Sequence, residues 1–348
     1  MRVPGESLCV KLVEILLEKG IGGLFKPWMI RREGEAIAEV TVKKKLLLAQ
    51  AEKDVQDIRA GVARVDKAGQ LLIAGRRIRV EPVISDQSGF CEENSGLIDR
   101  AFYLSMCDSV SKEIKIEKAI SCAEHELLRR DGSETGVELD DKKILTDDWI
   151  GRWRDYVHGV SSDEMIILWG KILAGEFCRP GSYSLRTLDF IKNITQEEAE
   201  LVQAMLPFVI RNDGIIFAED LRLLEKEGLS AQKIFDLQEL GVIAGSQVQT
   251  VDYYLNSEDV EGFKRALLFL NRAILVTSPE KKGKLTLKSF CLTKIGKELC
   301  LLGEYKENQG YLERICAHLK KAGFKVQIGS FVKESDDCSL IFNIVDFQ

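Results

Sequence analysis

Several kinds of functional group are scarce in this sequence of 348 residues. It contains only three histidines, His125, His158 and His318, in unrelated contexts and without the H-E-x-x-H spacing of zinc enzymes. No G-x-x-x-x-G-K-S/T sequence is present, which leaves phosphate binding by a P-loop unsupported. The nine cysteines are scattered without a C-x-x-C pair, a pattern typical of reduced, mostly buried thiols in a cytosolic protein. The sequence therefore indicates no catalytic residue, no metal site and no cofactor, and an enzyme is the least favoured class.

Long apolar runs are also absent. The first apolar stretch, Leu8 to Leu17, is interrupted by Lys11 and Glu14, and no other stretch reaches the roughly 18 uncharged apolar residues of a membrane-spanning helix. This pattern predicts neither a signal peptide nor a transmembrane segment. We expect a cytoplasmic protein, with peripheral contact at the inner membrane as the other option.

The charges are unevenly distributed. A formal net charge of -6 argues against a protein that coats nucleic acid. However, Lys19 to Arg79 contains 14 Lys/Arg and 7 Asp/Glu, a net of +7, whereas Asp86 to Ile150 contains 8 and 16, a net of -8. The basic segment could serve an anionic membrane, a nucleic acid or another subunit, but mutual neutralisation of the two segments within the fold is the favoured interpretation.

The N-terminal region reads as two helices joined by an apolar connection. Periodic apolar residues predict a helix from Glu6 to Lys19, which Gly20 ends. The glycine-rich, apolar connection must contact either the protein's own core, another subunit or, less favoured, a membrane interface. The residues predicted to make this partner or membrane contact are Leu24, Phe25, Lys26, Trp28, Arg31 and Arg32.

Long helices are expected next. The stretch from Met29 to Ala60 has apolar residues at three-to-four spacing, which suits either a coiled coil between subunits or a helix folded back on its own chain. Helical periodicity resumes from Leu97 to Arg130, and a mobile loop is predicted near residues 131–146.

The middle of the chain carries strong helix-start signals. Acidic capping residues open helices at Asp147 and Ser162, and Thr195 with Glu198 forms a capping box. The helix that follows Ser162 is apolar nearly all round and is predicted to lie at the centre of a bundle, with Gly170 allowing close helix packing. Capping also accounts for the acidic pairs at these starts. Asp220 with Glu225, Lys226 and Glu227 could suggest a metal nuclease, but these residues are expected on one helix and not on a pair of strands, so a nuclease is not favoured.

Three sequence segments here resemble a bacterial family known only as a domain of unknown function. They are D-W-I at 148–150, L-W-G-K-I-L-A-G-E at 168–176 and P-G-S-Y-S-L-R-T-L at 180–188, and the segments 19–27 and 30–36 are similar to the family's opening. The second segment also resembles the short core of abortive-infection alpha proteins. That resemblance implies a role in bacterial phage resistance.

The Pro-Gly turn of the third segment brings together the polar residues most worth testing. Here an arginine and several hydroxyls could hold an anion or an acidic partner. Alternatively, Arg186 pairs with Glu176 and Ser184 caps the next helix. The candidate residues are Ser182, Tyr183, Ser184, Arg186 and Thr187.

A winged-helix-like module is predicted over residues 195–303. Its wing is a β-hairpin formed by 273–277 and 285–290, with Lys281, Lys282 and Lys284 as candidate wing residues. The helix expected to read bases carries Asp236 and Glu239, so a protein-contact or structural module is favoured over a DNA-binding one.

These patterns predict a mainly α protein in four parts. They are a long helical arm (1–85), a helical bundle (86–194), the winged-helix-like α+β module (195–303) and a small α+β C-terminal piece (304–348). The favoured function is a non-enzymatic component of phage defence that acts through a homo-oligomer, a defence-system protein partner or a peripheral membrane contact. The alternative is a winged-helix transcriptional regulator, for which nucleic acid would be the partner.

Overall fold

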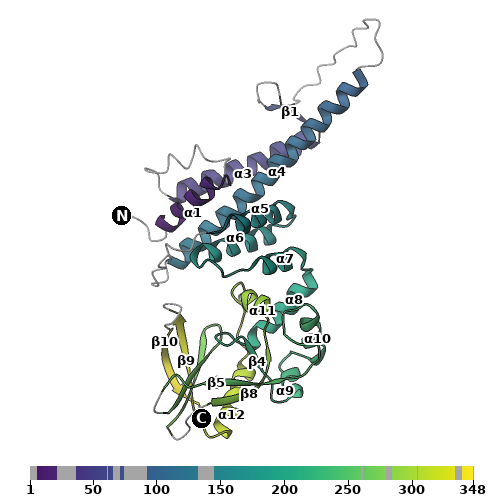
Figure 1. Cartoon of the computed structure of the whole chain (residues 1–348). Helices are drawn as coiled ribbons and strands as arrows, with labels where there is room; N and C mark the ends of the chain where they lie inside the picture. Colours follow the sequence, from purple (N-terminus) through teal and green to yellow (C-terminus); the bar gives the residue numbers. More distant parts are fainter. Residues whose placement is uncertain are drawn as a thin grey trace, which may run out of the picture. The chain divides into compact units, whose positions relative to one another are not determined.

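The chain divides into two compact units, an N-terminal unit that ends at Pro180 and a C-terminal unit that begins at Gly181. This computed structural model describes residues 6–21, 37–60, 62–65, 71–73, 92–131, 145–259, 262–279, 284–303, 305–333 and 339–347. The description below takes each unit by itself (Figure 1). The predicted domain boundaries at residues 85, 194 and 303 stay predictions.

The N-terminal unit is built from helices and one short hairpin. As predicted, helix α1 begins at Glu6, buries one apolar stripe that includes Leu12 and Leu16, and is followed by Gly20 with a φ of 72°. Its elements are α1 (Glu6–Glu18), α3 (Ile37–Arg59), β1 (Ala63–Val65), β2 (Leu71–Ile73), α4 (Glu92–Asp131), α5 (Asp147–Gly159) and α6 (Asp163–Cys178).

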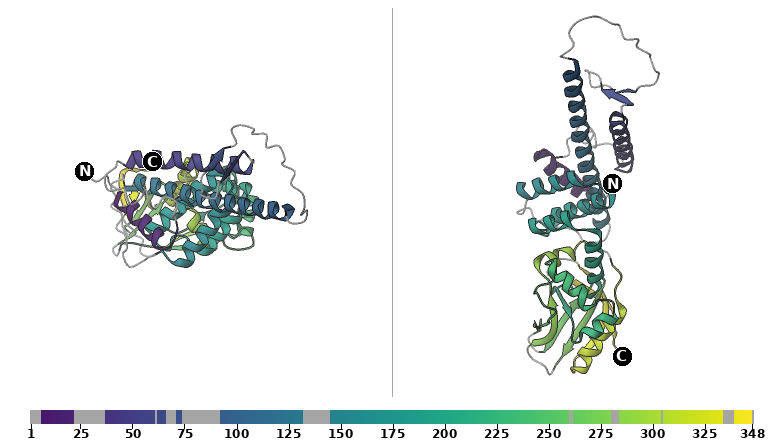
Figure 2. Two further views of the ribbon diagram at one scale, coloured as in Figure 1. Left: turned by 90° about the horizontal axis from the view of Figure 1, so that it is seen from above. Right: turned by 90° about the vertical axis from the view of Figure 1, so that its right-hand side faces the viewer.

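Helix α3 folds back on its own chain and packs along α4. Figure 2 shows the two helices side by side, and Leu48 and Val55 of α3 form a buried cluster with Cys107 and Ile114 of α4. Ala51, Val55 and Ile58 of the predicted apolar stripe thus pack within one chain, whereas Leu47 and Val62 are exposed.

Ion pairs accompany this packing. Arg59 Nη2 lies 2.7 Å from Asp108 Oδ1, and Lys19 pairs with Asp147. Both pairs join the basic segment to the acidic one, so the two segments neutralise each other at these positions, as the favoured interpretation of the charge pattern predicted.

Helix α6 is largely buried, but the central helix of the described part of this unit is α4, because α4 packs against α1, α3, α5 and α6, whereas α6 packs mainly against α4 and α5. Trp169, Ile172 and Leu173 are fully buried, and Ser162 caps the helix by accepting a hydrogen bond from Met165 N. At Gly170 the helix approaches α4 so closely that an added Cβ would lie 2.7 Å from the carbonyl oxygen of Ala119. Only glycine fits this contact, which is the packing role predicted for it.

The C-terminal unit contains two antiparallel sheets of four strands each, in the orders β3-β4-β8-β5 and β10-β9-β7-β6. The first comprises β3 (Val209–Ile210), β4 (Ile215–Phe217), β8 (Lys284–Cys291) and β5 (Val251–Asn256). The second comprises β10 (Ser339–Asp346), β9 (Lys325–Lys333), β7 (Arg272–Ser278) and β6 (Phe263–Leu268). The remaining elements are α7 (Leu185–Asn193), α8 (Gln196–Met205), η3 (Leu206–Phe208), α9 (Leu221–Lys226), α10 (Ala231–Glu239), α11 (Lys294–Leu299) and α12 (Gln309–Lys321).

The prediction of a mainly α fold with a winged-helix-like module is wrong, because the C-terminal unit is α+β with two sheets. The predicted wing does not form, since β7 and β8 belong to different sheets. Strand β7 pairs with β6 through Phe263↔Ser278 and with β9 through Thr277↔Lys325, so both of its edges are occupied. Strand β8 pairs instead with β4 and β5.

Two other predictions are confirmed, the first of them in part. The α+β composition predicted for residues 304–348 is present as helix α12 and strands β9 and β10, although these strands extend the β6–β7 sheet. The capping box of Thr195 and Glu198 is present at the start of α8. None of the described helices is both long enough and apolar enough to cross a bilayer.

Candidate functional site

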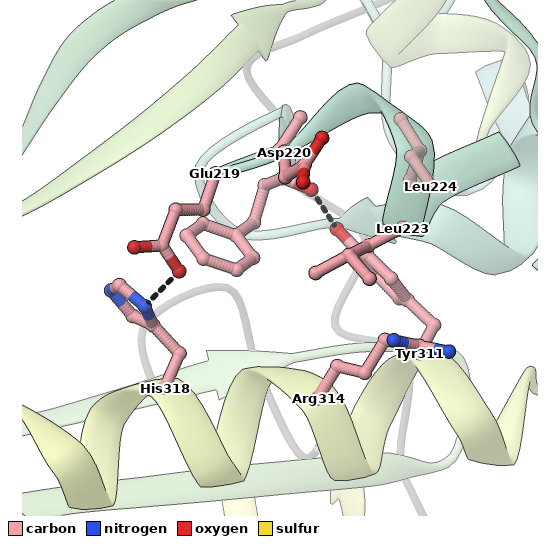
Figure 3. Close-up of a pocket in the computed structure, with 9 residues that line it drawn as sticks. Glu219, Asp220, Leu223, Leu224, Tyr311, Arg314 and His318 are labelled. Atoms are coloured by element: carbon pink, nitrogen blue, oxygen red, sulfur yellow. Dashed lines mark hydrogen bonds and ion pairs between the residues drawn. The ribbon is translucent and has the colours of Figure 1, made fainter. Parts of the chain in front are cut away.

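A small hollow opens on the C-terminal unit between α12 and the segment that connects β4 to α9 (Figure 3). It encloses about 50 Å³, which is room for one side chain and far less than a cofactor or drug-sized ligand occupies. Its lining residues are Phe217, Ala218, Glu219, Asp220, Leu223, Leu224, Tyr311, Arg314 and His318.

Local capping places both walls of the hollow. Asn308 Oδ1 accepts a hydrogen bond from Tyr311 N at 3.0 Å and begins α12. Tyr311, Arg314 and His318 then follow at three- and four-residue spacing and share one face of the helix. On the opposite wall, Asp220 caps α9 by accepting from Arg222 N at 2.9 Å.

The polar groups around the hollow are paired with one another. His318 Nδ1 lies 2.6 Å from Glu219 Oε2, and the His318 ring packs against Phe217 with centroids 4.9 Å apart. Arg314 Nε donates to Glu227 Oε1 at 2.7 Å. The Tyr311 hydroxyl donates to the carbonyl oxygen of Phe217 at 3.0 Å, and burial raises its pKa, so this hydroxyl stays protonated.

These contacts limit the chemistry of the hollow. A histidine oriented by a carboxylate is half of a nucleophile–base arrangement, but no serine, threonine or cysteine lies among the lining residues. Within the described residues no group of three His, Cys, Asp or Glu side chains could hold a metal ion. The arrangement therefore suits binding of a side chain more than a reaction.

The polar residues predicted at the Pro-Gly turn meet one of the chain's own carboxylates. Ser184 N and Oγ both donate to Oε2 of Glu298 in α11, at 2.7 and 3.0 Å. Thr187 is fully buried, and its hydroxyl oxygen lies 3.3 Å from Ser184 Oγ. The structure thus places an acidic group against these donors. The group is a side chain of the same unit, Glu298, and the contact joins α7 to α11.

The other predicted residues of this group are placed differently. Tyr183 is buried, Ser182 is half-buried and Arg186 is exposed. Ser184 is the N-cap residue of α7, although its hydroxyl makes no capping bond to the amides of that helix. Glu298 was not predicted as a site residue, because its only signal is a carboxylate on the buried side of the short helix α11.

The remaining predicted contact residues lie mostly outside the described residues. This holds for Leu24, Phe25, Lys26, Trp28, Arg31, Arg32, Lys281 and Lys282. Lys284 is exposed in β8, and its Nζ lies 5.7 Å from the centre of the Tyr254 ring.

Comparison with known proteins yields one match. Residues 115–316, more than half of the chain, match the model of a family described as a protein of unknown function, DUF2806. No curated protein and no solved structure matches the chain.

Proposed function

We propose that this chain, which belongs to the DUF2806 family of unknown function, is a non-enzymatic binding component of bacterial phage defence. In this proposal it acts through a protein partner, a second copy of itself or a membrane surface. One observation carries the non-enzymatic part: the polar side chains of the hollow are engaged with each other, and the space they enclose fits a single side chain.

A catalytic site needs polar groups that converge on a cavity large enough for a substrate. In the C-terminal unit, buried polar groups connect one element to another through hydrogen bonds and ion pairs. Glu298 joins α11 to α7, and Arg265 Nη2 joins β6 to the β3–β4 turn through Asp213 Oδ1 at 2.8 Å. These contacts support a scaffold that presents surfaces.

The phage-defence part of the proposal is supported by the resemblance of the L-W-G-K-I-L-A-G-E segment to abortive-infection alpha proteins. In this structure the segment lies in α6, where Trp169 and Leu173 are fully buried. Such a shared core segment favours a shared helical packing unit, so the contacts that act in defence would lie outside it. A winged-helix regulator is not proposed, because β7 and β8 do not pair.

The test is a plaque assay in a host that expresses the full chain. We expect a reduced efficiency of plaquing for some phages of a diverse panel. Unchanged plaquing across the panel would contradict the defence role. Light scattering of the purified chain, with and without phosphatidylglycerol vesicles at two salt concentrations, then separates oligomerisation from membrane contact.

Substitutions are better suited than truncation to test the predicted N-terminal contact. Removal of residues 1–28 would also remove α1, whose Leu12 and Leu16 are buried and whose Cys9 Sγ donates to Glu124 O. Such a truncation would expose the core of the N-terminal unit. We therefore choose the double substitution Phe25→Ala and Trp28→Ala and expect it to weaken vesicle or partner binding.

A further inference from the structure

We infer that the hollow beside α12 binds the side chain of an arginine presented by a partner protein. This inference rests on the proposed partner-binding function and names the chemical group that the hollow would recognise. Three features of the described residues carry it: the size of the hollow, its apolar floor and the charge of its rim.

The size and the floor fit a long, thin side chain. The hollow of about 50 Å³ is bounded by the apolar side chains of Phe217, Leu223 and Leu224. Leu224 is buried, whereas Leu223 remains half-exposed and accessible. An arginine has a stem of three methylene groups that can lie on such a floor while its head group stays near water.

The rim is acidic. Glu219 and Asp220 are exposed at the mouth, and Figure 3 shows their side chains on the wall opposite α12. The guanidinium of Arg314 is already paired with Glu227 at 2.7 Å, and Glu227 is only 17% exposed. The lining residues therefore supply two carboxylates and one guanidinium, together with the imidazole of His318. Because the charge of Arg314 is already balanced by Glu227 outside the hollow, the two rim carboxylates favour a cation.

The chemistry selects arginine over other cations. A guanidinium is planar and can donate to two carboxylates at once, whereas an ammonium acts as a point charge. Glu219 and Asp220 are adjacent in sequence and exposed. Asp220 accepts from Arg222 N through Oδ1, and Glu219 contacts His318 through Oε2, so the second oxygen of each carboxylate can accept from a guanidinium. An incoming arginine would thus meet two acceptors from one short segment.

The test uses N-acetyl-arginine methylamide as the probe and N-acetyl-citrulline methylamide as its neutral counterpart of nearly equal shape. Binding to the full chain is followed by saturation-transfer NMR. We expect an arginine dissociation constant of about 1 mM, as for a small fragment, and at least roughly fivefold weaker binding of citrulline.

The key variant combines Glu219→Gln and Asp220→Asn. Glutamine can still accept from His318, and asparagine is a good N-cap, so the fold is kept while two charges are removed. We expect roughly tenfold weaker arginine binding. The matched control is Glu225→Gln, which removes an exposed carboxylate from α9 outside the hollow and should leave binding unchanged.

Three results would overturn the inference: no arginine binding up to about 20 mM, equal binding of citrulline, or wild-type binding by the double variant. The plaque assay is independent of this probe. Protection without arginine binding would reject the hollow as the recognition site and leave the defence role standing, whereas arginine binding without protection would reject the defence role alone.

Discussion

The substitution Gly170→Ala should destabilise the N-terminal unit, although helix propensity predicts the opposite. Alanine is favoured over glycine inside a helix by about 1 kcal/mol. At Gly170, however, a Cβ would lie 2.5 Å from Cys122 Cβ, 2.7 Å from Ala119 O and 3.1 Å from Ala123 N. Two of these three atoms belong to the backbone of α4, so no side-chain rotation can relieve the contact.

The net effect can be estimated from these opposing contributions. Overpacking of a tight core contact costs typically up to about 3 kcal/mol, and the rigid backbone of α4 places this site at the upper end. After subtraction of the propensity gain, we expect a net loss of about 2 kcal/mol in the free energy of unfolding. For a unit of this size, that loss lowers the melting temperature by roughly 4–8 °C.

Tryptophan fluorescence can measure this loss of stability in the N-terminal unit. All four tryptophans of the chain, Trp28, Trp149, Trp153 and Trp169, precede residue 181, so the signal in urea reports on the N-terminal unit. The matched control is Gly151→Ala in α5, where nothing lies within 4 Å of the added Cβ. We expect it to stabilise by about 0.5–1 kcal/mol. A stabilising or neutral Gly170→Ala would refute the close-packing argument.

Three further predictions concern individual buried groups. Glu298→Ala leaves the two Ser184 donors without their acceptor and should lower the free energy of unfolding by about 2 kcal/mol. The loss is measured by near-ultraviolet circular dichroism of the tyrosines during urea unfolding, with Glu298→Gln as the milder control. Burial, the largest cause, lowers the pKa of His158 below 6.5, so the unfolded state binds more protons, and the free energy of unfolding should fall as pH decreases below about 6.5. In the fluorescence assay, His158→Gln should flatten this pH dependence. An unchanged slope in the variant would contradict the prediction. Burial raises the pKa of Cys300 to about 11 and of Cys316 to about 12, so iodoacetamide at about pH 8 should modify these thiols only after unfolding. Mass spectrometry maps the modified residues. Rapid labelling of the folded chain would contradict this prediction, because it would show that the thiols are accessible.

Local signals predicted the helices well because each depends on neighbouring residues. Ser162 and Thr195 cap the helices that begin beside them, and Gly20 ends α1. Strand pairing depends on distant residues instead. The polar, lysine-rich connection between β7 and β8 has the composition of a hairpin turn, yet β7 already has a partner on each edge. Strand β6, which pairs with β7, and strand β5, which pairs with β8, were not predicted, so the separation of β7 and β8 into two sheets could not be foreseen.

The candidate site was hidden for the same reason. Glu219 and His318 are 99 residues apart in sequence, and neither belongs to a motif. For the Pro-Gly turn, both an acidic partner and a capping role of Ser184 were left open; in the structure Ser184 N donates to Glu298, which is 114 residues away. Sequence spacing can show that a group of donors needs an acceptor; it cannot show whether the acceptor is a ligand or a helix of the same chain.

The same contacts determine which variants can report on function. Loss of protection by a variant of Ser184 or Glu298 would be ambiguous, because both residues hold α7 against α11 and their substitution destabilises the C-terminal unit. Exposed residues avoid this problem. Tyr254 in β5 is 58% exposed and Val345 in β10 is 67% exposed, so serine at either position removes apolar surface from an edge strand without opening the core. Loss of plaque protection at an unchanged unfolding midpoint would then identify a contact surface, because a change in folding would have moved the midpoint as well.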